Sequence, residues 1–251
     1  RRQRLRNLSR DGERPSFNDA NHTVSLGPTF SVDKRDNPLH PTRGWMVTST
    51  VGLALNSTDF TDLNADTSTK ETITTQLAIS QLKRRLIWVP TLRIGAVQTQ
   101  LSQDLLASDF LFKAGGDGVT FPVRGYEDAT IDACRGRLDE NHCTGVFASD
   151  DDDRQFPLTV GGRAIVAGSL EARISSFAVQ DLWFAGFMDA AAIATEWKRF
   201  RQESVFPSVG AGLRYLVTGQ IPLRLDVAWP LRQTAFADQS MRLHFNIFYP
   251  L

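Results

Sequence analysis

Hydrophobic and polar residues alternate along most of the chain. In residues 221–229, for example, every second side chain is apolar, and Arg224 and Asp226 lie between them. A period of two predicts a β-strand with one apolar and one polar face. Nine segments show this pattern, and turn-forming Gly, Pro, Asn and Asp residues separate most of them. They are residues 23–33, 45–56, 72–80, 87–101, 163–174, 183–195, 208–215, 221–229 and 241–249.

Such alternation is typical of any half-buried antiparallel sheet, so a soluble β-sandwich is the first alternative. Three features favour a transmembrane β-barrel instead. The segments approach the roughly 9–11 residues that a tilted strand needs to cross a bilayer. Aromatic residues near segment ends are expected to form interfacial girdles; these are Trp45, Trp88, Trp183, Trp197, Trp229 and Tyr249. Charged residues lie in the middle of the polar faces, where a water-filled lumen tolerates them; these are Arg163, Glu171, Arg173, Asp189, Arg214, Arg224 and Asp226.

The composition argues against other classes. The hydrophobic fraction of 41% is too high for a disordered chain, and the net charge of zero gives no sign of nucleic-acid binding. No run reaches the roughly 18–20 apolar residues of a membrane-spanning helix. The chain opens with a polar lead-in, residues 1–21, and starts with Arg1 rather than Met. We therefore expect a processed or truncated piece of an exported protein.

An odd number of strands does not fit a complete barrel, because single-chain bacterial barrels normally have an even number. An open sheet edge in lipid leaves backbone groups without hydrogen-bond partners, at several kcal/mol for each group. We therefore expect missing strands upstream, so that residues 1–251 form part of an all-β antiparallel barrel domain.

One long irregular stretch, residues 102–159, interrupts the strands and carries the most specific motif. Its segment Ala114-Gly115-Gly116-Asp117-Gly118, followed by Val123-Arg124-Gly125-Tyr126, resembles the loop signature of the outer-membrane assembly and translocation superfamily that includes BamA and TamA. In that family the signature lies in a loop that folds back into the barrel lumen. Other segments resemble the family in the same order; they are residues 36–45, 160–171, 209–215, 222–228 and 245–247.

The resemblance covers about residues 24–247. It implies the last nine strands of a barrel of about sixteen, in the outer membrane of a Gram-negative bacterium. It also implies preceding periplasmic POTRA repeats, and protein insertion or translocation through a weak lateral seam between the first and last strands. The expected partners are outer-membrane lipid, client β-barrel or secreted proteins, and periplasmic accessory subunits, with no nucleic acid.

Arg124 is the candidate residue with the clearest physical role. In the family the loop arginine packs against a strand with an F-x-D-x-G pattern, and Phe187 and Asp189 match its first two residues, with Ala191 in place of the glycine. Phe187 and Asp189 share a strand face by parity, and a guanidinium pairs with a carboxylate or stacks on an aromatic ring. A lumen loop lock of Val123, Arg124, Gly125, Tyr126, Phe187 and Asp189 is therefore expected. The alternative is a solvated loop arginine and an ordinary lumen aspartate.

The two cysteines, Cys134 and Cys143, lie in the same long loop. An exported protein passes through an oxidising periplasm, so we expect a local disulfide between them. A zinc site with His142 lacks further ligands at suitable spacing. The acidic run at residues 150–153 is interpreted as solvated charge rather than as a Ca²⁺ site.

The sequence contains no recognisable catalytic constellation. The loop glycines Gly115, Gly116 and Gly118 are not followed by the Lys-Ser/Thr pair of a phosphate-binding loop. The four histidines have no H-E-x-x-H context and no nucleophile elbow. We therefore expect no enzyme activity, no cofactor and no bound metal. Two other functions stay open at this point: a passive channel or transporter of a small polar solute, and the membrane anchor of a fused hydrolase.

Overall fold

A computed structural model describes residues 22–57, 66–99, 111–117, 120–131, 138–139, 142–143, 161–200, 205–219, 221–232 and 240–247. A short 3₁₀ helix, η2 (Trp197–Arg199), follows the ninth strand. The strands are β1 (His22–Leu26), β2 (Thr29–Asp33), β3 (Gly44–Ser57), β4 (Asp66–Gln81), β5 (Leu86–Thr99), β6 (Leu138–Asp139), β7 (His142–Cys143), β8 (Ala164–Ser175), β9 (Leu182–Ala194), β10 (Val205–Val217), β11 (Ile221–Pro230) and β12 (Arg242–Ile247).

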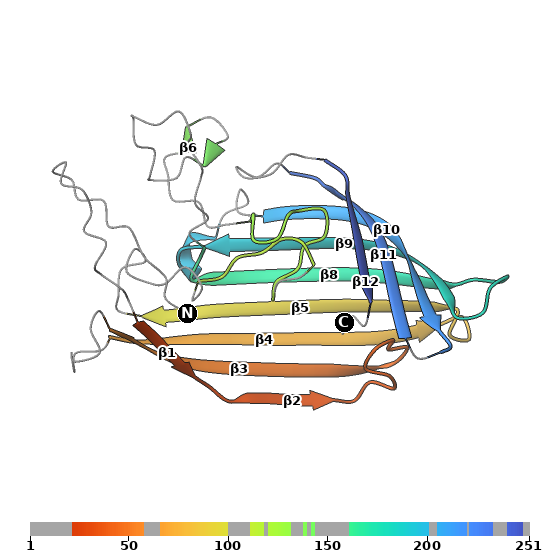
Figure 1. The fold of residues 1–251 in the computed structure, drawn as a ribbon, viewed down its shortest axis with the longest axis horizontal. Helices are drawn as coiled ribbons and strands as arrows, with labels where there is room; N and C mark the ends of the chain where they lie inside the picture. The colour runs from red at the N-terminus through yellow and green to blue at the C-terminus, as the bar shows by residue number, and fades with distance from the viewer. Residues whose placement is uncertain are drawn as a thin grey trace.

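Within the described residues, ten strands form one antiparallel sheet in which each long strand pairs with its neighbours in the chain (Figure 1). The nine segments predicted from the alternation all appear as strands, so this prediction is confirmed. The first segment is divided into β1 and β2, which both pair with β3 in one register, with Leu26 opposite Leu53 and Thr29 opposite Thr50. Pro28 lies at the division and has no N–H for the ladder.

The connections between strands are mostly short at one end of the sheet and long at the other. Residues 82–85 join β4 to β5, for example, whereas residues 100–163, which include β6 and β7, separate β5 from β8. Short periplasmic turns and long extracellular loops are typical of bacterial outer-membrane barrels. The sheet therefore has the two unlike ends of such a barrel.

The convex face of the sheet is apolar. In β12, Leu243, Phe245 and Ile247 are 66%, 60% and 52% exposed. Alternate positions of the other strands carry more exposed large hydrophobic side chains; among them are Phe30, Val47, Leu53, Ile73, Leu92, Leu170, Phe184, Met188, Leu213 and Leu225. So large an apolar surface is unfavourable in water and is the surface that a transmembrane strand presents to lipid. The predicted fold class, an antiparallel transmembrane β-barrel sheet, is therefore confirmed.

The tryptophans do not all lie on this outer face. Trp45 and Trp229 are 43% and 44% exposed, at opposite ends of the sheet, as girdle residues would be. Trp183 faces the other way, and its ring centroid lies 5.2 Å from that of His40. The expectation of an interfacial role is therefore wrong for Trp183, which has the same strand parity as the inward-facing Phe187.

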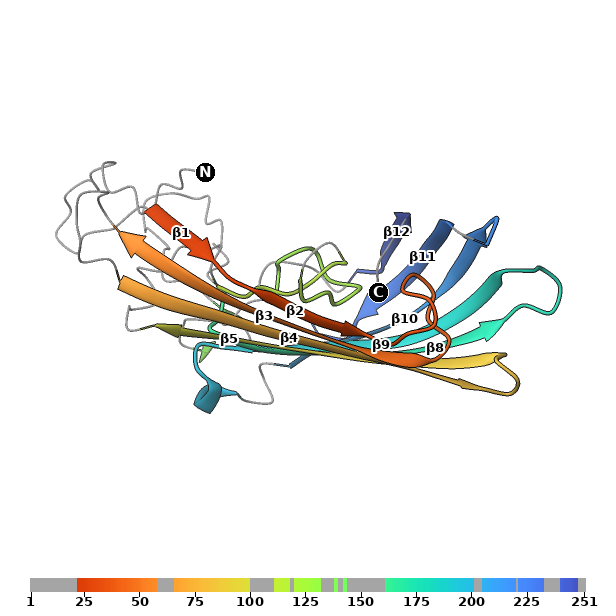
Figure 2. The ribbon, with the colours of Figure 1, turned by 90° about the horizontal axis from the view of Figure 1, so that it is seen from below.

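The two edges of the sheet are not joined to each other. Among the described residues, β1 and β2 pair only with β3, and β12 pairs only with β11. The sheet is strongly curved but open between these edges (Figure 2). In the part of the chain that the structure describes, no helix has the length and apolar character needed to span a membrane.

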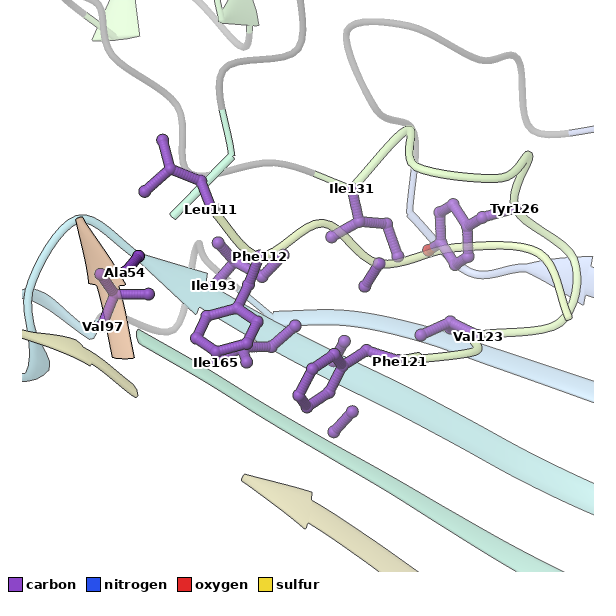
Figure 3. Close-up of a cluster of buried hydrophobic side chains, with 13 residues drawn as sticks. Ala54, Val97, Leu111, Phe112, Phe121, Val123, Tyr126, Ile131, Ile165 and Ile193 are labelled. Carbon is purple, nitrogen blue, oxygen red and sulfur yellow. The ribbon is translucent and has the colours of Figure 1, made fainter. Parts of the chain in front are cut away.

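The concave face carries the main hydrophobic core. Loop residues that include Phe112, Phe121 and Ile131 pack against Ile165 and Ile193 of the sheet (Figure 3). The Phe112 and Phe121 rings meet edge to face, with centroids 5.2 Å apart. The inner face is thus apolar beneath the loop, and its charged residues gather elsewhere on the same face.

Candidate functional site

The long loop returns along the concave face of the sheet (Figure 2). Isolated bridges join Gly116 to Val123 and Ala114 to Ile131, so the loop folds onto itself, and Phe112 bridges to Gly162 just before β8. These backbone bonds give the loop a fixed shape against the sheet.

Two motif glycines permit this course. Gly115 has φ +126°, and a Cβ there would lie 2.1 Å from the carbonyl oxygen of Glu127. Gly125 has φ +93°, and a Cβ there would lie 3.1 Å from the backbone nitrogen of Pro230 in β11. Both positions therefore require glycine, for backbone conformation and for close approach. Gly118 lies outside the described residues.

Arg124 joins the loop to the sheet. Its Nε and Nη2 donate hydrogen bonds to the two carboxylate oxygens of Asp189, at 2.6 and 2.7 Å, and its backbone N–H donates to the same group at 3.2 Å. The guanidinium carbon lies 3.4 Å from the centroid of the Phe187 ring. The side chain is thus paired bidentately and stacked on an aromatic face. A solvated loop arginine does not describe this geometry, because Arg124 is only 5% exposed.

Glu171 of β8 lies at the centre of the surrounding ion pairs. Its Oε1 accepts hydrogen bonds from Arg173 and Arg214, and its Oε2 accepts from Arg124 and Arg214. Asp226 of β11 also accepts from Arg124 and Arg214. Three carboxylates thus face four guanidiniums in the Arg124 network, which comprises Arg124, Ser169, Glu171, Arg173, Asp189, Arg214, Arg224 and Asp226.

The register of the strands explains why these residues meet. Ser169 of β8 is directly opposite Asp189 of β9, and Ser169 donates a hydrogen bond to that carboxylate at 2.6 Å. Arg214 of β10 is opposite Arg224 of β11, so their long side chains both reach Asp226. Residues of neighbouring strands on one face lie close enough to interact. The sheet thus presents a group of acceptors to an arginine that comes from the loop.

The electrostatics of Arg124 follow from this environment. Burial alone would lower its pKa, but the charges of Asp189, Glu171 and Asp226 outweigh burial and raise the pKa well above its ordinary value. The guanidinium is therefore permanently charged, and a buried charge of this kind is tolerable only while its partners stay in place.

Tyr126 provides a second attachment of the motif. Its hydroxyl donates to the carbonyl oxygen of Pro207 in β10 at 2.9 Å, and its ring meets Phe206 edge to face with centroids 6.2 Å apart. Burial raises the pKa of Tyr126 to about 12. Val123 is fully buried in the loop core. The structure therefore brings all four residues of the Val123–Tyr126 motif against the sheet or the core.

Comparison with known proteins identifies the group to which this arrangement belongs. A family model described as the Omp85 superfamily domain matches residues 2–247. The chain belongs to the Omp85 superfamily. No curated protein matches it.

A solved structure has the same fold as this Omp85 chain. It is BamA from Haemophilus ducreyi lacking POTRA domains 1–3, with a TM-score of 0.62 and 18% sequence identity. The match covers 89% of the present chain and 42% of that chain. The Omp85 chain thus spans less than half the length of the protein that it resembles, and at this identity the likeness shows the fold.

His40 is a buried residue of the Omp85 chain that the sequence did not single out. It lies in the connection from β2 to β3, and its Nδ1 is 3.4 Å from Nη1 of Arg173. Burial, and next the positive charge of Arg173, lower the pKa of His40 to about 3. His40 is therefore neutral at physiological pH, and it attaches this connection to the edge of the Arg124 network.

Sequence reasoning found Arg124, Phe187 and Asp189 but did not connect Glu171 or Arg214 to them. The available signal was the position of charged residues in mid-strand on the polar faces. Ala191, which replaces the motif glycine, lies in regular strand β9 and packs in the core. The disulfide prediction falls outside the described residues, which do not include Cys134 or the side chain of Cys143, and so does the acidic run at residues 150–153.

Proposed function

We propose that this chain is the carboxy-terminal part of a β-barrel that inserts or translocates proteins in the outer membrane of a Gram-negative bacterium. Membership of the Omp85 superfamily and the likeness to BamA support this proposal. The observation that carries it is the Arg124 network, in which a loop arginine is buried among carboxylates of three sheet strands, β8, β9 and β11. The remaining strands of the barrel, to a total of about sixteen, and any POTRA repeats would come from upstream sequence.

In this proposal the loop is a lock on the barrel interior. A passive pore has no need of a buried guanidinium or of an apolar core beneath its loop, because both reduce the space for solute. A lock does need them. Breaking a buried ion pair costs about 3–5 kcal/mol, and this cost keeps the loop in one conformation. Val123, Arg124, Gly125, Tyr126, Phe187 and Asp189 are its contact residues.

The proposed site of action is the open edge of β12. Among the described residues, no strand pairs with the side of β12 that faces away from β11, so this edge can pair with a further strand, either the first strand of the closed barrel or a strand of a client. Edge strands recognise extended chains by this kind of β-augmentation. The partners would be outer-membrane lipid, client barrel or secreted proteins, and periplasmic accessory subunits.

The test uses the full-length protein in phospholipid vesicles and a radiolabelled client barrel, with the appearance of a protease-protected client as the readout. Arg124→Ala removes the buried guanidinium, and Arg124→Lys keeps the charge but loses the bidentate fork. Arg84→Ala is the matched control, because Arg84 lies exposed in the β4–β5 turn. Mobility on an unheated gel reports whether each variant forms a barrel.

We expect both Arg124 variants to insert the client at least about tenfold more slowly than the control, as the loss of one buried charge-assisted contact implies. Folded Arg124→Ala protein that inserts the client at the rate of Arg84→Ala would refute the lock. Higher ion conductance with no insertion by any variant, wild type included, would instead favour the channel.

A further inference from the structure

Strand β12 has an unusual attachment to the rest of the molecule. Its pairing with β11 covers six residues, whereas β11 pairs with β10 over ten. Its three inward-facing side chains all contact the long loop; they are Arg242, His244 and Asn246. The last strand is therefore held from two sides, by the sheet and by the loop.

Asp117 is the main loop partner. Nδ2 of Asn246 donates a hydrogen bond to its carboxylate, and Nδ1 of His244 lies 3.6 Å from the other carboxylate oxygen. The neighbouring His244 ring, together with the charge of Arg224 and the hydrogen bond from Asn246, lowers the pKa of Asp117, although burial acts in the opposite direction. Arg224 of β11 is 3.9 Å away. Asp117 therefore stays charged and faces donors from the last two strands.

A second contact comes from the arginine motif itself. The backbone N–H of Gly125 donates to Nε2 of His244 at 3.1 Å. Because Nε2 accepts this bond, the ring proton is on Nδ1, which is the atom nearest to Asp117. His244 therefore bridges two parts of the loop, and Gly125 follows directly after Arg124. Any movement that withdraws Arg124 from its carboxylates also removes a partner of β12.

Glu127 makes a third and weaker contact. Its Oε1 is 2.9 Å from Nη1 of Arg242, but its side chain is 53% exposed, compared with 18% for Asp117. Exposed ion pairs are screened by solvent and stabilise little. The hold on β12 therefore depends mainly on Asp117 and on the N–H of Gly125.

We infer that the loop is a brace for the terminal strand, and that Asp117 and His244 are the positioning residues that couple loop seating to the edge of β12. This inference rests on the proposed function, because that edge is where a client strand would pair. While the loop is seated, β12 is fixed in register on β11. When the loop is withdrawn, the short ladder with β11 is the one strand pairing that β12 keeps among the described residues, and β12 becomes free to move.

The first experiment measures the brace without any client, by hydrogen exchange of the β12 amides in the full-length protein in vesicles. Asp117→Ala should speed exchange of residues 242–247 about tenfold, as expected for loss of a partly buried charge-assisted hydrogen bond, and leave the β8 amides unchanged. Glu127→Gln is the matched control on the same loop and should change exchange by less than about twofold. If Asp117→Ala gives no folded barrel, Asn246→Ala tests the same contact from the strand. Wild-type exchange of β12 in either folded variant would overturn the brace.

The second experiment links brace and function. Asp117→Cys combined with Asn246→Cys, in a chain whose natural cysteines are replaced by serine, should form a disulfide that fixes the loop to β12. We expect oxidised protein to lose client insertion and reduced protein to regain it. Unchanged insertion by fully oxidised protein would overturn the coupling. If wild type inserts no client but Asp117→Ala still speeds β12 exchange, the brace stands and the proposed function falls.

Discussion

Replacing Glu171 by glutamine perturbs the Arg124 network with almost no change of shape. Oε1 accepts from Nε of Arg173 at 2.7 Å and from Nε of Arg214 at 3.1 Å. Oε2 accepts from Nη1 of Arg124 and from Nη2 of Arg214, both at 2.7 Å. A glutamine has an NH₂ group in place of one oxygen. Whichever way the amide is turned, its hydrogens point at guanidinium donors.

The magnitude follows from burial and from charge. Glu171 is only 3% exposed, so solvent neither screens its ion pairs nor replaces them. Removing one partner of a buried pair costs about 3–5 kcal/mol, whereas losing an ordinary neutral hydrogen bond costs about 1 kcal/mol. Because three guanidiniums share this carboxylate, we expect Glu171→Gln to lower the free energy of unfolding by about 3–5 kcal/mol.

The assay is urea unfolding of the full-length barrel in phospholipid vesicles, followed by tryptophan fluorescence and by mobility on unheated gels. Glu71→Gln is the matched control, because Glu71 shares strand parity with the exposed Ile73 of β4 and lies away from the network. The same chemical change there should alter the unfolding free energy by no more than about 0.5 kcal/mol.

A double-mutant cycle decides whether the cause is unpaired charge. Adding Arg214→Met to Glu171→Gln removes one of the stranded guanidiniums, so the double variant should lose less stability than the sum of the single variants. Additive losses, or a Glu171→Gln protein within about 0.5 kcal/mol of wild type, would refute the role of Glu171 as the shared acceptor.

Three further predictions concern the surroundings of the network. The pKa of His40 falls from 6.5 to about 3 in the folded protein, so only the unfolded chain binds a proton between these values. The free energy of unfolding should therefore decrease as the pH is lowered from 6.5 toward 3, by up to about 1.4 kcal/mol per pH unit, and urea titrations of His40→Gln should show a shallower slope. Gly125→Ala should unseat the loop, because φ of +93° is strained for alanine by about 1–3 kcal/mol, and faster proteolysis of the loop would reveal it. Phe187→Leu keeps the apolar contact but removes the ring beneath Arg124. It should lower the free energy of unfolding by about 1–2 kcal/mol. A loss as small as that of the Glu71→Gln control would show that stacking on the ring does not stabilise Arg124.

The strands could be predicted because the residues of each strand alternate according to the two faces that this strand presents. In β11 the apolar residues Leu223, Leu225 and Val227 alternate with Arg224 and Asp226, and the alternation holds whatever lies on either side. The same parity places Trp183 on the inner face, but its position near a strand end suggested a girdle instead. Parity is set by backbone geometry, whereas the girdle is a statistical tendency, so parity should decide such conflicts.

The site was only partly predictable, because its residues meet through the register of several strands. Arg124 is 47 residues from Glu171, 65 from Asp189 and 102 from Asp226 in the chain. The resemblance identified Asp189, because the family pattern includes the carboxylate that pairs with the loop arginine. The alternation shows which carboxylates face inward, but it does not show which of them lie side by side on neighbouring strands. Sheet order and register are needed for that, and they are fixed by all the strands together.

The same consideration explains why loop and sheet form one unit. Without Arg124, the carboxylate of Asp189 would keep only the hydroxyl of Ser169 among the hydrogen-bond partners of its side chain in the described residues. Without the sheet, the loop would expose Val123, Tyr126 and the rest of its apolar core to water. Burying an unpaired charge and exposing an apolar cluster are both unfavourable. The sheet without the loop and the loop without the sheet are therefore each less stable than the two packed together. A loop bound in this way is either seated or withdrawn, with little in between, which is the behaviour that a lock on a strand edge requires.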